Sequence, residues 1–161
     1  MKKTIIDLFE SSVAKYGDKD FLLEKHDGAF QPTSYKQTRE LALKVGAGLA
    51  SIGVKPKQTV SILAEGCNNW IISELGLLYA GAISVPLSIK LEEANDLLFR
   101  LRHADVETIF VSRNQLPKIR SIREQLPLVK NVIIFSDADP IRRGNHPRPY
   151  NPCRLCKANH P

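Results

Sequence analysis

The stretch Thr59–Leu87, TVSILAEGCNNWIISELGLLYAGAISVPL, determines the fold that the rest of the chain must complete. Its first apolar run, Val60–Ala64, has the length of a short buried strand. The segment Ile71–Ala80 is apolar on almost every face, which is typical of a deeply buried helix. After an Ala-Gly-Ala break, Ile83–Leu87 reads as a second strand with a proline near its end. This order predicts a buried β-α-β unit.

Downstream of this unit the same alternation continues. Apolar residues at helical spacing predict helices over residues 94–104 and 116–126, the second capped by Asn114. Short apolar runs predict strands at Thr108–Val111 and Val132–Phe135. Strands that alternate with helices of this length pair in parallel through right-handed crossovers. We therefore expect an α/β fold with a parallel half-sheet of the doubly wound type and flanking helices.

Upstream, the first helix is expected over Thr4–Tyr16, where apolar residues recur at near-helical spacing. Thr4 and Asp7 have the spacing that caps a helix start. Gly17 is expected to end this helix in the left-handed conformation.

A hairpin and a second helix follow. Phe21–Glu24 and Ala29–Thr33 bracket His-Asp-Gly, a sequence typical of a hairpin turn. The helix is predicted over Ser34–Ile52. Gly46 and Gly48 lower helix stability, so we expect them to allow close packing against a neighbour.

Composition bounds the class of protein. The 161 residues are 43% hydrophobic and 25% charged, values that are ordinary for a globular domain. The net charge is +6, but the 18 basic and 15 acidic residues in positions 1–136 give only +3, and the 5 basic and 2 acidic residues in the last 25 positions give the other +3. A nucleic-acid partner is therefore not expected.

No apolar run reaches the roughly 20 residues of a transmembrane segment. No secretory leader is recognisable, and three cysteines suit a reducing, cytoplasmic location.

Four motifs occur in an order and spacing that point to one family. They are Ser34–Gln37 at a helix start, the Leu-x-x-x-Gly-Val turn at Leu49–Val54, the strand and turn ending in tryptophan at Val60–Trp70, and the Ala-Gly-Ala-x-x-Val-Pro-Leu segment at Ala80–Leu87. The chain resembles the N-terminal region of AMP-forming acyl-CoA synthetases, the adenylate-forming ligases. It looks most like bacterial long-chain fatty acid–CoA ligases, over about residues 4–136.

The resemblance implies the first part of the large N-terminal domain of such a ligase. Its one departure, Lys55–Gln58 in place of a Gly-Asp pair, falls in a surface turn. The intact family joins a fatty acid to coenzyme A through an acyl-adenylate, using ATP and Mg²⁺. The family's phosphate loop, Tyr-Thr-Ser-Gly-Thr-Thr-Gly, does not occur in this sequence, so the resemblance assigns no catalytic or cofactor-binding residue here.

Residues 1–136 are therefore expected to be a partial AMP-binding domain with no bound cofactor. We expect a truncated ligase that does not adenylate by itself. The alternative is a stand-alone interaction module that pairs with a complementary ligase half. Either way, one sheet edge and an apolar helix face are expected to be exposed, with marginal stability or self-association as the result.

The first β-α turn, 65–69, contains one glycine, which favours an ordinary capped turn over a phosphate site. Trp70 is interpreted as a packing anchor and Cys67 as an unactivated thiol. His103 is expected to have a structural role at a helix end.

The tail, residues 137–161, is rich in proline and arginine and lacks apolar periodicity. Such a segment is expected to be disordered or aberrant, as a change of reading frame would make it. The alternative is a scaffold with a zinc- and nucleic-acid-binding tail. Its weak metal candidates are Cys153, Cys156, His146 and His160, which include a Cys-x-x-Cys pair.

Overall fold

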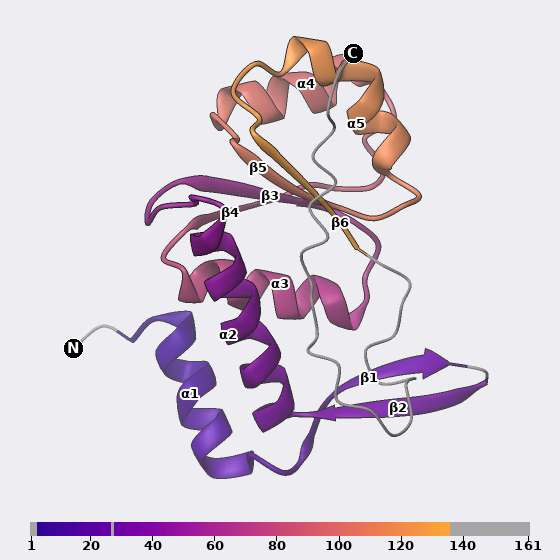
Figure 1. Cartoon of the computed structure of the whole chain (residues 1–161). Helices are drawn as coiled ribbons and strands as arrows, with labels where there is room; N and C mark the ends of the chain where they lie inside the picture. The colour runs from indigo at the N-terminus through magenta and orange to yellow at the C-terminus, as the bar shows by residue number, and fades with distance from the viewer. Residues whose placement is uncertain (1–2, 27, 136–161) are drawn as a thin grey trace. The chain divides into compact units, whose positions relative to one another are not determined.

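A computed structural model describes residues 3–26 and 28–135 of the chain (Figure 1). These residues form two compact units. Unit 1 is built from the described residues within Met1–Lys57 and Gly66–Ile83, and unit 2 from those within Gln58–Glu65 and Ser84–Pro161. None of the helices in the described ranges is long and apolar enough to cross a membrane.

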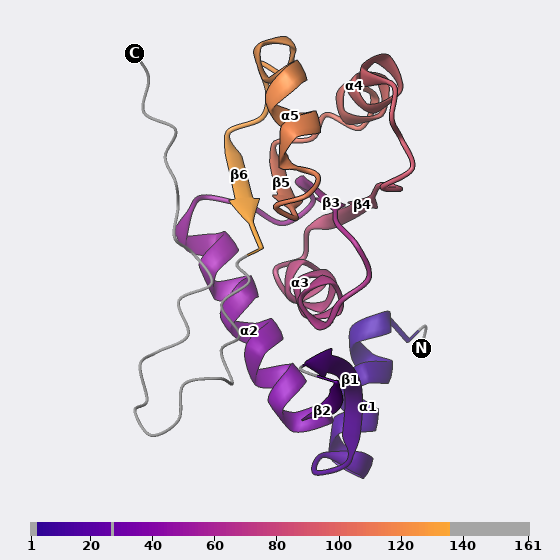
Figure 2. The ribbon, with the colours of Figure 1, turned by 90° about the vertical axis from the view of Figure 1, so that its right-hand side faces the viewer.

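Unit 1 contains three helices and a hairpin. Its elements are α1 (Ile5–Tyr16), β1 (Asp20–His26), β2 (Ala29–Ser34), α2 (Tyr35–Ser51) and α3 (Asn68–Tyr79). The strands β1 and β2 pair antiparallel, as the His-Asp-Gly turn predicts, and Gly28 takes a positive φ of 86° there. Figure 2 shows α1 and the hairpin beside the same end of α2.

The first two helices begin as the sequence predicts. Thr4 and Asp7 form a complete capping box at the start of α1, and Ser34 with Gln37 forms another at the start of α2. The prediction for Gly17 is wrong, because its φ of −40° is right-handed. The turn after α1 is instead closed by backbone hydrogen bonds, including one from the Lys19 N–H to the Tyr16 carbonyl at 2.7 Å.

The core of unit 1 joins its helices through aromatic and small residues. Phe9, Ala42 and Leu75 are buried at its centre. Phe21 and Tyr35 surround Phe9, with ring centroids 5.5 and 6.4 Å away. The buried side chains thus come from α1, α2 and α3 together, which makes unit 1 depend on contacts far apart in the sequence.

Glycines let α2 and α3 approach closely. A Cβ added at Gly46 would lie 3.0 Å from the Gly76 carbonyl oxygen, so the predicted close packing is confirmed at this position. The same prediction is wrong for Gly48, because nothing lies within 4 Å of a Cβ added there.

Unit 2 is the predicted parallel α/β layer. Its elements are β3 (Thr59–Leu63), β4 (Ile83–Pro86), α4 (Ala94–His103), β5 (Thr108–Val111), α5 (Leu116–Ile122), a 3₁₀ turn η1 (Arg123–Gln125) and β6 (Asn131–Ile134). The strand order is β4-β3-β5-β6, and β5 pairs in parallel with both β3 and β6. This confirms the expected α/β class with a parallel half-sheet flanked by helices. In both views α4 and α5 lie on one face of the sheet (Figures 1 and 2).

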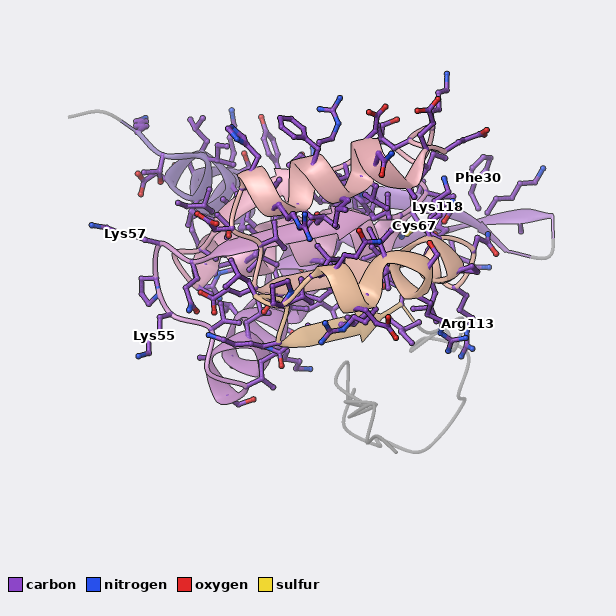
Figure 3. All side chains as sticks on the ribbon, turned by 90° about the horizontal axis from the view of Figure 1, so that it is seen from above. Phe30, Lys55, Lys57, Cys67, Arg113 and Lys118 are labelled. Carbon is purple, nitrogen blue, oxygen red and sulfur yellow. The ribbon has the colours of Figure 1, made fainter. Side chains whose placement is uncertain are left out.

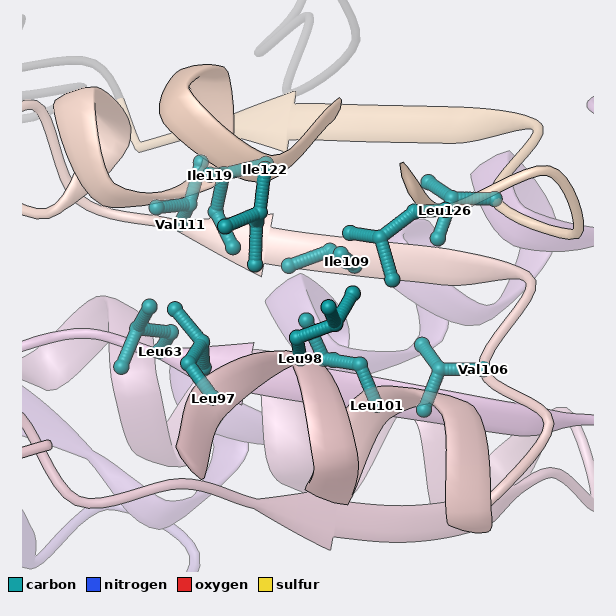
Figure 4. Packing of buried hydrophobic residues seen from close by; sticks show 11 residues of the cluster. Leu63, Leu97, Leu98, Leu101, Val106, Ile109, Val111, Ile119, Ile122 and Leu126 are labelled. Atoms are coloured by element: carbon teal, nitrogen blue, oxygen red, sulfur yellow. The ribbon is translucent and has the colours of Figure 1, made fainter. Parts of the chain in front are cut away.

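The core of unit 2 fills the space between the sheet and these two helices (Figure 4). Leucines of α4 and isoleucines of α5 meet the β-branched residues of β5. The buried members of this cluster include Leu97, Leu98, Leu101, Ile109, Val111, Ile119 and Ile122. Most are residues that the helical and strand periodicity marks as inward-facing.

The second α-helix of this layer, α5, is shorter than predicted. Its cap residue is Gln115 and not Asn114, and the α-helix ends at Ile122. A 3₁₀ turn follows, held by the Arg123 guanidinium, which donates to the carbonyls of Leu126 at 3.0 Å and Val129 at 2.8 Å. Both carbonyls lie at or beyond the point where a helix to residue 126 would end, so no intrahelical N–H would be available to them.

Candidate functional site

The topology of unit 2 defines where a ligand site is expected. The chain passes from β3 to β4 on one side and then to β5 on the other, so the connections diverge between β3 and β5. In open α/β sheets, ligands bind outside the carboxyl ends of the strands at such a switch point. The segments that leave these ends are the Ala64–Glu65 turn after β3 and Ser112–Gln115 after β5.

A polar cluster joins these two segments. The Gln115 side-chain Nε2 donates to Glu65 Oε1 at 2.7 Å, and the Gln115 backbone N–H lies 3.3 Å from Ser112 Oγ. Hydrogen bonds from Ser112 and Gln115 lower the pKa of Glu65 below its usual value and outweigh the opposing effect of burial. Glu65 is therefore an ionised acceptor that ties the two turns together.

Gln115 is the most buried member of the cluster, with 9% of its surface exposed. Its side-chain oxygen, Oε1, is buried and has no hydrogen-bond partner among the described residues. Because Nε2 already donates to a carboxylate, exchanging the two amide atoms would place two acceptors together. Gln115 thus holds an unsatisfied hydrogen-bond acceptor beside the turns that follow β3 and β5.

Two basic side chains come from the segment after β5 and from α5. Figure 3 shows Arg113 and Lys118 at the same end of unit 2. The Lys118 Nζ donates to the Ile89 carbonyl at 2.6 Å, so it ties the loop after β4 to α5. The cluster therefore holds loops together, and its carboxylate has the lowered pKa of a structural acceptor and not the raised pKa of a general acid.

The β-α turn that starts α3 has a capping carboxylate from another element. Cys67 is the N-cap residue of α3 and makes no side-chain capping bond. Instead, Glu24 of β1 accepts from the Asn68 N–H at 3.3 Å. A negative charge at a helix N-terminus is favourable. This carboxylate therefore stands where a phosphate would have to bind.

The other singled-out residues lie at the ends of helices. Trp70 and Cys67 are both partly buried. His103 lies in the last turn of α4, where its ring stacks on Phe99 with centroids 5.5 Å apart. In the described ranges, no group of three or more His, Cys, Asp and Glu side chains is placed to hold a metal ion. The tail candidates Cys153, Cys156, His146 and His160 lie outside the described residues.

Sequence reasoning missed the Glu65–Gln115 pair and the Glu24 cap. The partners are separated by 50 and 44 residues, respectively. Local periodicity carries no information on such contacts. The strand order does, because it brings the ends of β3 and β5 together, and it could have directed attention to Glu65 and to the segment after residue 111.

Fold and site together define a parallel α/β unit with a hydrogen bond between Gln115 and Glu65 at the switch point. The family described as AMP-binding enzyme matches residues 9–154, and the chain belongs to this family. The match runs past residue 136, the boundary that the composition predicts.

The names of individual relatives agree with this family assignment. The chain is 29% identical to the long-chain-fatty-acid–CoA ligase ACSBG1 of Bos taurus over 141 residues, which is 87% of this chain and 19% of that protein. It is 28% identical over 109 residues to the chloroplastic long-chain-fatty-acid–[acyl-carrier-protein] ligase AEE15 of Arabidopsis thaliana, covering 68% of this chain and 15% of that protein. The chain thus spans about a fifth of the length of these curated relatives.

Solved structures give the same fold. The anthranilate CoA ligase AuaEII in complex with anthranoyl-AMP matches with a TM-score of 0.74 and 25% identity, over 80% of this chain and 24% of that chain. The N-terminal domain of FACL13 from Mycobacterium tuberculosis matches with a TM-score of 0.74 and 20% identity, over 83% of this chain and 34% of that chain. The fold is therefore that of the N-terminal domain of adenylate-forming ligases, as the motifs predict.

Proposed function

We propose that this chain is the first α/β unit of an ATP-dependent long-chain fatty acid–CoA ligase. The observation that carries the proposal is the family match over residues 9–154, together with relatives whose names specify long-chain fatty acids. ATP, Mg²⁺ and coenzyme A would then be cofactors and substrates of the whole ligase, and a fatty acid its acyl substrate. A cytoplasmic location remains a prediction from the cysteine content.

The 161 residues are proposed not to form an acyl-adenylate by themselves. Adenylation requires donors that cradle the phosphates and a cation that stabilises charge on the transferring phosphoryl group. The sequence has no phosphate loop. The Glu65–Gln115 cluster places a carboxylate at the switch point, which has the wrong charge to bind a phosphate. What the chain contributes to the reaction is therefore a scaffold on which further residues act.

The test is fatty-acid-dependent exchange between ATP and pyrophosphate, measured with the chain alone and with a full-length long-chain ligase as the positive control. We expect no exchange above background from the chain alone at any fatty acid length. Fatty-acid-dependent turnover by the purified chain would overturn the claim of inactivity. The claim of membership in a working ligase is tested by a chimera in which this chain replaces the aligned segment of a long-chain fatty acid–CoA ligase.

A further inference from the structure

We draw no further inference here: the strongest candidate, the apolar groove of unit 2 between the end of α4 and the segment before β6, lined by Leu101, Val106, Leu126 and Leu128, carries none because nothing in the structure shows what covers it.

Discussion

Gly76 is the tightest point in the packing of unit 1. A Cβ added there would lie 2.6 Å from the Val45 Cβ and 2.9 Å from the Ala42 carbonyl oxygen. Both distances are too short for any side chain, so α3 can pack on α2 only with a glycine at this position. The requirement comes from the contact between two helices and cannot be read from the helix in which Gly76 lies.

We predict that Gly76→Ala lowers the free energy of unfolding by about 1–3 kcal/mol, because the added methyl group overpacks the α2–α3 contact. Gly48→Ala is the matched control on the same pair of helices. Nothing lies within 4 Å of its added Cβ, so alanine should raise stability by about 0.5–1 kcal/mol through helix propensity. Urea unfolding of both variants measures the difference. Equal effects of the two substitutions would contradict the packing account.

At the scale of elements, one polar contact ties the three helices of unit 1 together. Glu10 of α1 accepts from Arg39 Nε of α2, at 2.8 and 2.9 Å for its two oxygens, and from the Tyr79 hydroxyl of α3. Burial raises the pKa of Glu10, but the hydrogen bonds from Tyr79 and Arg39 and the Arg39 charge outweigh it, so the net shift is downward. The sequence could not predict this contact, because Glu10 and Tyr79 are 69 residues apart.

A lowered pKa in the folded state means that this contact contributes stability above the ordinary pKa of Glu10, near 4.5, and loses it as the pH falls through the folded-state pKa. We therefore predict that Tyr79→Phe costs about 1 kcal/mol at pH 7, a value reduced for the partial exposure of the ion pair. The cost should be smaller at pH 3 than at pH 7, because Glu10 takes up a proton as the pH falls and then accepts more weakly from the Tyr79 hydroxyl. Denaturant unfolding at the two pH values checks this, and a cost that is the same at both would count against the role of the Glu10 charge.

The connection from α5 to β6 shows how a single long side chain can end a helix. Apolar spacing at Ile119, Ile122 and Leu126 predicts the buried face, and these three residues are buried. The spacing does not predict the change from α-helix to 3₁₀ turn, since this depends on where the Arg123 guanidinium finds carbonyl acceptors.

We predict that Arg123→Ala destabilises unit 2 by about 1–2 kcal/mol, because it leaves the carbonyls of Leu126 and Val129 without their charged donor. Arg120→Ala in the same segment removes an equal charge from an exposed position, and its effect should stay within about 0.5 kcal/mol. Thermal unfolding followed by circular dichroism compares the two. Equal losses would show that net charge, and not the two hydrogen bonds, matters here.

At the scale of the whole molecule, the sequence predicts class and element order well. The alternation of short apolar strands with helices specifies a parallel α/β layer, and Thr4 and Ser34 mark two helix starts that the structure confirms. The sequence-based predictions that fail share one physical cause. The conformation of Gly17, the end of α5 and the Glu24 cap on α3 are all decided by backbone or side-chain partners outside the local pattern.

The candidate site likewise depends on contacts between residues that are far apart in the sequence. The missing phosphate loop can be read directly from the sequence, and it is the basis for expecting no adenylation by the chain alone. The Glu65–Gln115 cluster becomes visible only when the strand order brings the ends of β3 and β5 together. The cluster ties together the turns that follow β3 and β5. Under the proposed function, the rest of a ligase would have to supply the phosphate-binding groups there.

The measurement that tests the central claim most directly is fatty-acid-dependent ATP–pyrophosphate exchange by a chimera. The segment of a long-chain fatty acid–CoA ligase that aligns with this chain is replaced by this chain, and the same ligase with the segment deleted serves as the control. If the chain is the first α/β unit of such a ligase, the chimera should exchange pyrophosphate with a long-chain fatty acid while the deletion remains inactive. A chimera that folds and binds ATP, yet shows no more exchange than the deletion, would contradict the account.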